Sequence, residues 1–274
     1  MKKNVKKNIV IIITIFILII IIYILSNANT KENFTNNNEA YVINLDERRD
    51  RWEQIQNSFA GSSIKLNRIS AVKHNNGHIG CGLSFMKIIK LAKEKNLKTV
   101  LIFEDDNKPL DNFDDRWNII KNWLDNNLDK WEIFNGGARF DNWDTITNDK
   151  IPDSCKTIKL AYNIDNKEYL FKNDIMVALN WIYVNSSVYD KILEWENNSN
   201  KIKNFSLGKH PVDRYITDIK NFNHVFCLPV LALQQNGESD TSELRRTYFN
   251  FNKTDKYIIN VYKEVYKNRL NFNI

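Results

Sequence analysis

The longest apolar run of the chain extends from residue 9 to residue 25, and only Thr14 and Tyr23 interrupt it. As a helix rising about 1.5 Å per residue, it would span close to the hydrocarbon thickness of a bilayer. A cleavable signal peptide is the alternative, because the small residues Ser26 and Ala28 follow the run. Apolar regions of signal peptides, however, typically have only about 7 to 15 residues. We therefore predict an uncleaved transmembrane anchor.

The charges around this run predict its orientation. Before it stand four lysines and no acidic residue, namely Lys2, Lys3, Lys6 and Lys7. Because positively charged flanks stay in the cytoplasm, we predict a single-pass type II protein whose body faces a luminal or extracytoplasmic space, as in the endoplasmic reticulum or Golgi. These lysines carry most of the net charge of +6, which leaves +6 − 4 = +2 for the rest of the chain. A nucleic-acid partner is therefore not expected.

The polarity pattern divides the chain into four segments. A basic cytoplasmic tail covers residues 1–8 and the anchor covers residues 9–25. Residues 26–39 are polar and rich in asparagine, without apolar periodicity, which is typical of a flexible stalk. Residues 40–274 contain no internal repeat and no clear linker. We interpret them as one catalytic domain.

Within the body, short apolar runs alternate with segments of helical periodicity. Residues 40–45 read as a buried strand, and the following segment has helical spacing at Trp52, Ile55 and Phe59. The next predicted elements are a strand at 64–69, a helix at 83–95 and a strand at 99–103. Further strands are predicted at 131–135, 176–184 and 225–233, and further helices at 117–128 and 188–195. This order predicts an α/β fold with a mixed, mostly parallel sheet.

Polar side chains follow the first and third predicted strands, at the edge where open α/β sheets bind ligands. Glu104, Asp105 and Asp106 come directly after residues 99–103, and Asn44 ends the first strand. Acidic residues also favour ordinary solvated turns. Because strand residues alternate between faces, Glu104 and Asp106 should point one way and Asp105 the other. Such carboxylates could hold a divalent cation together with substrate phosphates.

Three further segments carry candidate chemistry, each with an ordinary structural explanation. Arginines at 48, 49 and 51 could bind phosphate, or could form local ion pairs at a helix start. The three glycines within residues 77–84, immediately before the predicted helix, could let a ligand approach the backbone. Asp213, just after a proline, could be a general base or could compensate a helix dipole. The three cysteines form no CxxC pair, so neither a zinc site nor a disulfide framework is predicted.

Taken in order, these segments resemble glycosyltransferase family 25, which includes lipooligosaccharide galactosyltransferases and collagen-type hydroxylysine galactosyltransferases. The segments that carry the resemblance span roughly residues 41–242: YVINLDERRDRW, RISAV, GCGLSF, LIFEDD, KWEIFNGGA, LNWIYVNSSVYDKIL, HPVDRYI and VFCLPVLALQQNGESDTS. The resemblance implies a GT-A type fold, a UDP-sugar donor carrying galactose or glucose, a Mn²⁺ or Mg²⁺ ion, and inverting transfer to a hydroxyl of a glycan or protein acceptor.

The resemblance also implies roles for individual residues. Asp213 would be the catalytic base. Glu104 and Asp106 would serve the metal. The donor would contact residues at the strand ends and in the glycine-rich segment, namely Asn44, Arg48, Arg51, Gly80, Ser84, Glu104 and Asp105.

The sequence departs from the family pattern at Phe85, where the family usually has histidine, and in the short segment 73–79. These departures leave two other functions open. One is a catalytically inactive transferase fold that binds glycans or acts as a scaffold. The other is a metal-dependent phosphohydrolase that uses the acidic cluster, although no second acidic motif of recognisable spacing supports it.

Overall fold

The computed structural model describes Leu18 and residues 38–137, 139–140, 158–172, 176–177, 179–200, 211–218 and 222–235. The chain divides into two compact units, Met1–Asn38 and Glu39–Ile274, and the second is the subject here. Apart from Leu18, the predicted tail and anchor lie outside the described residues, as does nearly all of the predicted stalk. Among the described residues, no helix is long and apolar enough to cross a membrane.

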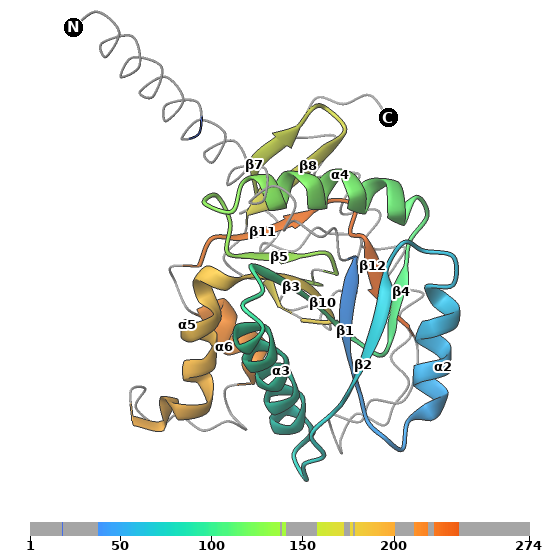
Figure 1. The fold of residues 1–274 in the computed structure, drawn as a ribbon, viewed down its shortest axis with the longest axis vertical. Coiled ribbons are helices and arrows are strands. Elements are labelled where there is room, and N and C mark those ends of the chain that lie inside the picture. The colour runs from blue at the N-terminus through green and yellow to red at the C-terminus, as the bar shows by residue number, and fades with distance from the viewer. Residues whose placement is uncertain are drawn as a thin grey trace, which may run out of the picture. The chain divides into compact units, whose positions relative to one another are not determined.

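A mixed sheet forms the centre of the described body (Figure 1). Its eight described strands lie in the order β2-β1-β3-β10-β5-β11-β8-β7. Their bounds are β1 Glu39–Asn44, β2 Lys65–Ser70, β3 Thr99–Glu104, β5 Ile133–Asn135, β7 Lys159–Ile164, β8 Glu168–Lys172, β10 Trp181–Asn185 and β11 His224–Cys227. The pairings run six of these strands in one direction and only β8 and β10 in the other. The predicted α/β fold with a mixed, mostly parallel sheet is therefore confirmed.

Two small sheets and several helices complete the described fold. β4, Asn107–Pro109, pairs with β12, Ala232–Gln234, and β6, Arg139–Phe140, pairs with β9, Met176–Val177. The α-helices are α2 Arg49–Ser58, α3 Gly77–Glu94, α4 Phe113–Asn126, α5 Tyr189–Leu193 and α6 Val212–Asp218. Two 3₁₀ segments flank α5, namely η3 Ser186–Val188 and η4 Glu194–Asn200.

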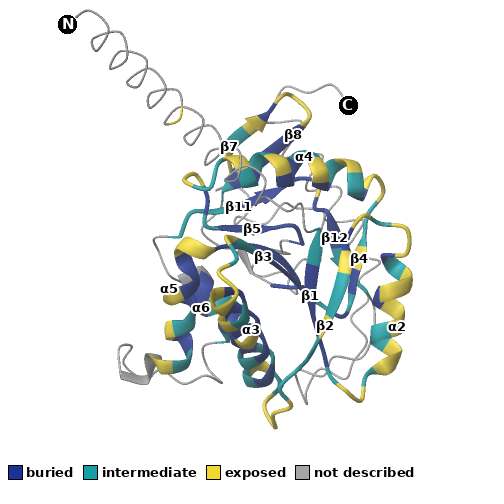
Figure 2. Ribbon diagram, viewed as in Figure 1, coloured by how far each residue is buried: buried dark blue, intermediate teal, exposed yellow. Residues whose placement is uncertain are grey.

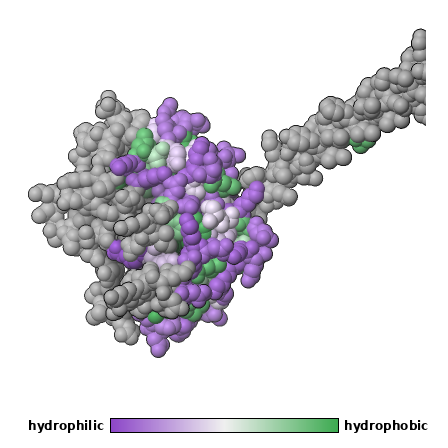
Figure 3. Space-filling view, turned by 90° about the vertical axis from the view of Figure 1, so that its left-hand side faces the viewer, coloured by the Kyte–Doolittle hydropathy of each residue, from purple (hydrophilic) through white to green (hydrophobic). Residues whose placement is uncertain are grey.

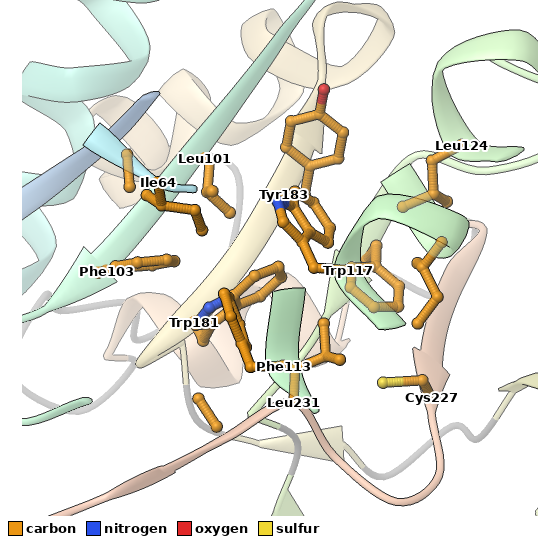
Figure 4. Close-up of a cluster of buried hydrophobic side chains, with 14 of the residues drawn as sticks. Ile64, Leu101, Phe103, Phe113, Trp117, Leu124, Trp181, Tyr183, Cys227 and Leu231 are labelled. Atoms are coloured by element: carbon orange, nitrogen blue, oxygen red, sulfur yellow. The ribbon is translucent and has the colours of Figure 1, made fainter. Parts of the chain in front are cut away.

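The sheet buries apolar side chains on both faces, because successive residues of a strand point to opposite sides. In β3, Leu101 and Phe103 pack towards α2 and α4, whereas Val100 and Ile102 pack towards α3, α5 and α6. In Figure 2 the central strands β3, β5 and β11 are coloured mostly as buried. Trp117 lies in the cluster on the α2 and α4 face of the sheet. It meets Trp181 edge-on, with ring centroids 4.8 Å apart (Figure 4).

The described surface of the body offers few apolar side chains. Leu160 is the one large apolar residue among the described part of residues 39–274 that is classed as exposed. In the view of Figure 3, apolar patches are small and hydrophilic side chains separate them. The described part of the body therefore buries most of its large hydrophobic residues in the clusters on the two faces of the sheet.

Three predicted elements differ from the structure. The predicted strand 176–184 is two strands, β9 and β10, separated around Leu179 and Asn180. The predicted strand 225–233 is also two, because it contains Pro229, which lacks the N–H that a ladder needs. The helix expected from residue 83 begins at Gly77, where the Asn76 side chain accepts hydrogen bonds from the first amides. The hairpin β7–β8 was not predicted.

Candidate functional site

Residues 104–106, called the acidic turn below, lie at the end of β3. At this edge of the sheet two other strands also bring polar residues. β1 runs parallel to β3 with Ile43 opposite Glu104, so Asn44 ends beside the turn. The antiparallel strand β10 starts at the same edge, where the backbone N–H of Glu104 donates to the carbonyl of Asn180 at 2.8 Å. The topology therefore brings the ends of β1 and β3 and the start of β10 together around residues 104–106.

Asp105 is buried and its carboxylate is held by two elements. Its Oδ2 accepts from Asn44 Nδ2 at 2.7 Å, and its Oδ1 accepts from Arg51 Nη1, on α2, at 3.0 Å. Asn44 is itself buried and accepts from Arg68 Nε at 2.7 Å. In this structure the three predicted donor ligands Asn44, Arg51 and Asp105 thus form a network that ties the acidic turn to β1 and α2.

Glu104 and Asp106 are both half-buried, and a residue from the C-terminal part of the described chain joins them. Gln234, at the end of β12, donates from Nε2 to Glu104 Oε2 at 3.1 Å and to Asp106 Oδ2 at 3.4 Å. The next residue, Gln235, donates its backbone N–H to the carbonyl of Asp106 at 2.6 Å. Sequence reasoning assigned no role to Gln234; its only indication was its place within the segment LALQQNG.

Cys81 and Asp213 belong to the same neighbourhood. The thiol of Cys81, on α3, lies 3.9 Å from Glu104 Oε1. Burial raises the pKa of this thiol well above its usual value, and so does the negative charge of nearby carboxylates, in decreasing order those of Glu104, Asp213, Asp106 and Asp105. Asp213 stands in the first turn of α6, which packs against α3. Glu104 therefore contacts the thiol directly, and the charges of the other three carboxylates act on it.

Other predicted donor ligands have structural partners. The guanidinium of Arg48 donates to Asp50 at 3.0 and 2.9 Å. Ser84 is fully buried; its hydroxyl donates to the Gly80 carbonyl and accepts from Val72 N–H, both at 2.7 Å. A Cβ on Gly80 would lie 2.6 Å from the Val72 carbonyl oxygen. Gly80 and Ser84 therefore lie inside α3 and serve its packing, and donor contact by these residues stays a prediction.

The residues missed by sequence reasoning also include a buried asparagine pair beneath the turn. Asn107 donates from Nδ2 to the Glu104 carbonyl at 3.0 Å, and Asn180 donates from Nδ2 to Asn107 Oδ1 at 3.0 Å. Gly137 lies directly against Asn180, since a Cβ added to it would be 2.5 Å from Asn180 Nδ2. These buried contacts fix the backbone of the acidic turn.

The donor set at the turn suits a hard divalent cation bound together with phosphate. Within the described residues, no group of three or more His, Cys, Asp or Glu side chains is arranged to hold a metal. Glu104 and Asp106 nevertheless direct one oxygen each to the same amide nitrogen. Mg²⁺-type ions are commonly bound by one or two carboxylates plus substrate phosphates rather than by a complete protein cage. The pair therefore fits a cation that a diphosphate helps to bind.

The described cysteines are free thiols, Cys81 half-buried and Cys227 fully buried. Cys155, which completes the set, lies outside the described residues. Burial raises the pKa of Cys227 to about 12. Its thiol packs among apolar side chains in the cluster shown in Figure 4.

Comparison with known proteins gives remote structural similarity only. No protein-family model matches the chain, and no curated protein matches it significantly. A197 from STIV is similar over 73% of this chain and 94% of its own, with a TM-score of 0.37 and 9% identity. The apo form of UDP-glucose pyrophosphorylase is similar over 84% of this chain and 82% of its own, also with a TM-score of 0.37 and 9% identity. This similarity is too remote to indicate a substrate, and membership in glycosyltransferase family 25 stays a prediction.

Proposed function

We propose that this protein is a metal-dependent, inverting glycosyltransferase that moves a hexose, galactose or glucose, from a UDP-sugar to a hydroxyl of a glycan or protein. The observation that carries the proposal is the pair Glu104 and Asp106 at the end of β3, whose carboxylates share the Gln234 amide. A metal-dependent, inverting transfer needs a cation site for the diphosphate and a separate base for the acceptor. The ordered resemblance of the sequence to family 25 supports the same function.

The proposed roles follow from where each carboxylate lies. Glu104 and Asp106 share the Gln234 amide and would hold Mn²⁺ or Mg²⁺, which supplies Lewis-acid stabilisation of the departing diphosphate. Asp213 approaches from a different element, α6. It would accept the proton of the acceptor hydroxyl as that oxygen attacks the anomeric carbon from the face opposite the diphosphate.

The hydrogen bonds of Asp105 would hold Glu104 and Asp106 in fixed positions. Asp105 is bonded to Asn44 and Arg51, so the turn that carries Glu104 and Asp106 is fixed to β1 and α2. Positioning of this kind contributes strongly to catalysis, because small displacements of reacting groups lower rates steeply. We therefore propose that Asp105 supports donor binding indirectly, by fixing the positions of Glu104 and Asp106.

The proposal includes membrane attachment. Residues 9–25 would anchor the protein as a single-pass type II membrane protein, with residues 40–274 on the luminal or extracytoplasmic side. Attachment would be tested by alkaline extraction of membranes that contain the full chain, and orientation by protease protection. Release of the intact chain into the alkaline supernatant would refute the anchor.

The enzymatic part would be tested by release of UDP from a panel of UDP-sugars, with and without Mn²⁺ and candidate acceptors. Asp213→Asn should lower kcat by about 100-fold or more with little change in the KM for the donor, as expected for loss of a base. Asp106→Asn should remove metal-dependent turnover. The matched control is Asp111→Asn, because Asp111 is an exposed aspartate on the same connection. Metal-independent turnover unaffected by Asp106→Asn would overturn the assigned metal role, and failure to bind UDP with Mn²⁺ would favour a glycan-binding or scaffold protein.

A further inference from the structure

The side chain of Gln234 lies between the carboxylates of Glu104 and Asp106, and the pairing of its backbone determines that position. In the antiparallel pair β12–β4, Gln234 lies opposite Asn107, the residue that follows the acidic turn. The backbone N–H of Gln235 donates to the Asp106 carbonyl at 2.6 Å. The main chain therefore holds the Gln234 side chain at the mouth of the turn, independently of the hydrogen bonds that its amide makes.

The amide of Gln234 places partial positive charge where carboxylate oxygens from both sides converge. Its Nε2 lies 3.1 Å from Glu104 Oε2 and 3.4 Å from Asp106 Oδ2. Two half-buried carboxylates this near to one donor would otherwise repel each other across it. An amide also has a second face, because its carbonyl oxygen is among the ligands that hard divalent cations accept. Rotation about the last side-chain bond exchanges the two faces.

The neighbouring residue shows that this arrangement is not a general property of β12. Gln235 carries the same side chain, but its Nε2 donates to Ser58 Oγ at 2.9 Å and to the Asn107 carbonyl at 3.1 Å. Its Oε1 accepts from Gln54 at 2.5 Å. Gln235 thus joins β12 to α2 and β4, whereas Gln234 contacts the two carboxylates. Of the two adjacent glutamines, Gln235 therefore has a structural role, and Gln234 is the one directed to the site.

We propose that Gln234 serves the metal site in two successive ways: its amide N–H₂ holds Glu104 and Asp106 together before the cation binds, and after rotation of the amide its carbonyl oxygen becomes a ligand of the divalent cation. This inference rests on the proposed function, since it assigns a residue to the cation of that same site. It explains how two carboxylates can form a cation site without a third acidic or histidine ligand among the described residues. It also explains why the cation needs the diphosphate for full affinity. The third ligand is a neutral amide and supplies no third negative charge.

Direct Mn²⁺ binding to the full chain would test the inference by calorimetry and by the Mn²⁺ paramagnetic resonance signal, with and without UDP. Gln234→Leu should weaken Mn²⁺ binding in the presence of UDP by about tenfold. Gln234→Glu should strengthen binding of Mn²⁺ alone by about tenfold, because affinity rises with ligand charge. The control Gln235→Leu should stay within about twofold of wild type, since Gln235 does not touch the carboxylates.

Thermal melting provides a second reading that does not depend on turnover. Addition of Mn²⁺ should raise the melting temperature of Gln234→Glu more than that of wild type, because the stabilisation of the folded state by a ligand grows with the logarithm of its affinity. Equal Mn²⁺ affinities for wild type and Gln234→Leu, or no gain in Gln234→Glu, would overturn the role of Gln234 while leaving the metal site intact. Absence of Mn²⁺ binding to wild type with UDP would instead refute the proposed function itself.

Discussion

The triplet Glu104, Asp105 and Asp106 should separate into one carboxylate that stabilises the fold and two that do not. Asp105→Ala removes the acceptor of two hydrogen bonds, one from Asn44 at 2.7 Å and one from Arg51 at 3.0 Å. The side chains of Arg51 and Asp105 are only 13% and 10% exposed, so water replaces little of the lost interaction. We expect a large loss of stability from this one substitution.

The magnitude follows from the partners left behind. Breaking a buried ion pair by removing one partner costs about 3 to 5 kcal/mol, because the remaining charge stays desolvated. The slight exposure of Arg51 favours the lower end of that range, about 3 kcal/mol. Asp106→Ala removes a half-buried carboxylate whose charge, like those of Glu104, Asp105 and Asp213, raises the pKa of Cys81. Because like charges repel, this substitution should change the free energy of unfolding by no more than about 1 kcal/mol.

Urea denaturation followed by tryptophan fluorescence would measure both changes, because Trp117, Trp131, Trp181 and Trp195 are all buried. Arg51→Met and the double variant with Asp105→Ala complete a thermodynamic cycle, in which we expect a coupling energy of at least about 1 kcal/mol. A loss below about 1 kcal/mol in Asp105→Ala would refute the structural role of Asp105. An equal loss in Asp106→Ala would refute the separation of the triplet.

Three further substitutions test other parts of the fold. Gly82→Ala should lower stability by about 2 kcal/mol, because its Cβ would lie 2.2 Å from Cη2 of the buried Trp195; thermal melting measures this. Glu168→Ala should cost about 3 kcal/mol, seen as a lower urea midpoint, because Arg116 donates to both oxygens of Glu168 at 2.6 and 2.9 Å. Burial lowers the pKa of His224 from 6.5 to about 4, so the unfolded chain binds a proton first and stability should fall as pH drops from 6.5 towards 4. His224→Phe should flatten urea midpoints measured across that range.

Each of these predictions has a matched control. Trp195→Phe should restore part of the stability of Gly82→Ala, because it shortens the ring that the new methyl group would meet. Arg116→Met should partly rescue Glu168→Ala by removing the unpaired charge. His78→Phe should leave the pH dependence unchanged, because His78 is exposed. Failure of these controls to behave differently from the test variants would show that the proposed contacts do not cause the effects.

The sheet edge and the acidic turn were predictable because local pattern and topology agree there. Apolar runs ending at Asn44 and Glu104 mark two parallel strands, and parallel strands end at one edge. The direction of each carboxylate also follows from the alternation of side chains along a strand. The hydrogen bond that Asn44 accepts, in contrast, comes from Arg68 on a third strand, β2, and no local pattern indicates that partner.

The start of α3 was mispredicted because tertiary packing overrides the low helix propensity of glycine. Gly82 faces Trp195 of the 3₁₀ segment η4, and only a residue without a side chain fits there. The hairpin β7–β8 had a local indication that was not used. Asp165 and Asn166 adopt positive φ angles of 52° and 57°, which Asp and Asn tolerate better than most residues.

The pairing of β4 with β12 has a consequence for the order in which the protein is made. Gln234 follows Asp106 by 128 residues, so the ribosome completes the acidic turn long before the strand that joins its two carboxylates has been synthesised. Contacts so distant along the chain close slowly, since the entropy of loop closure must be overcome first. The proposed cation site should therefore be one of the last parts of the body to assemble, and a nascent chain that already carries Glu104 and Asp106 would still lack the Gln234 amide that joins them.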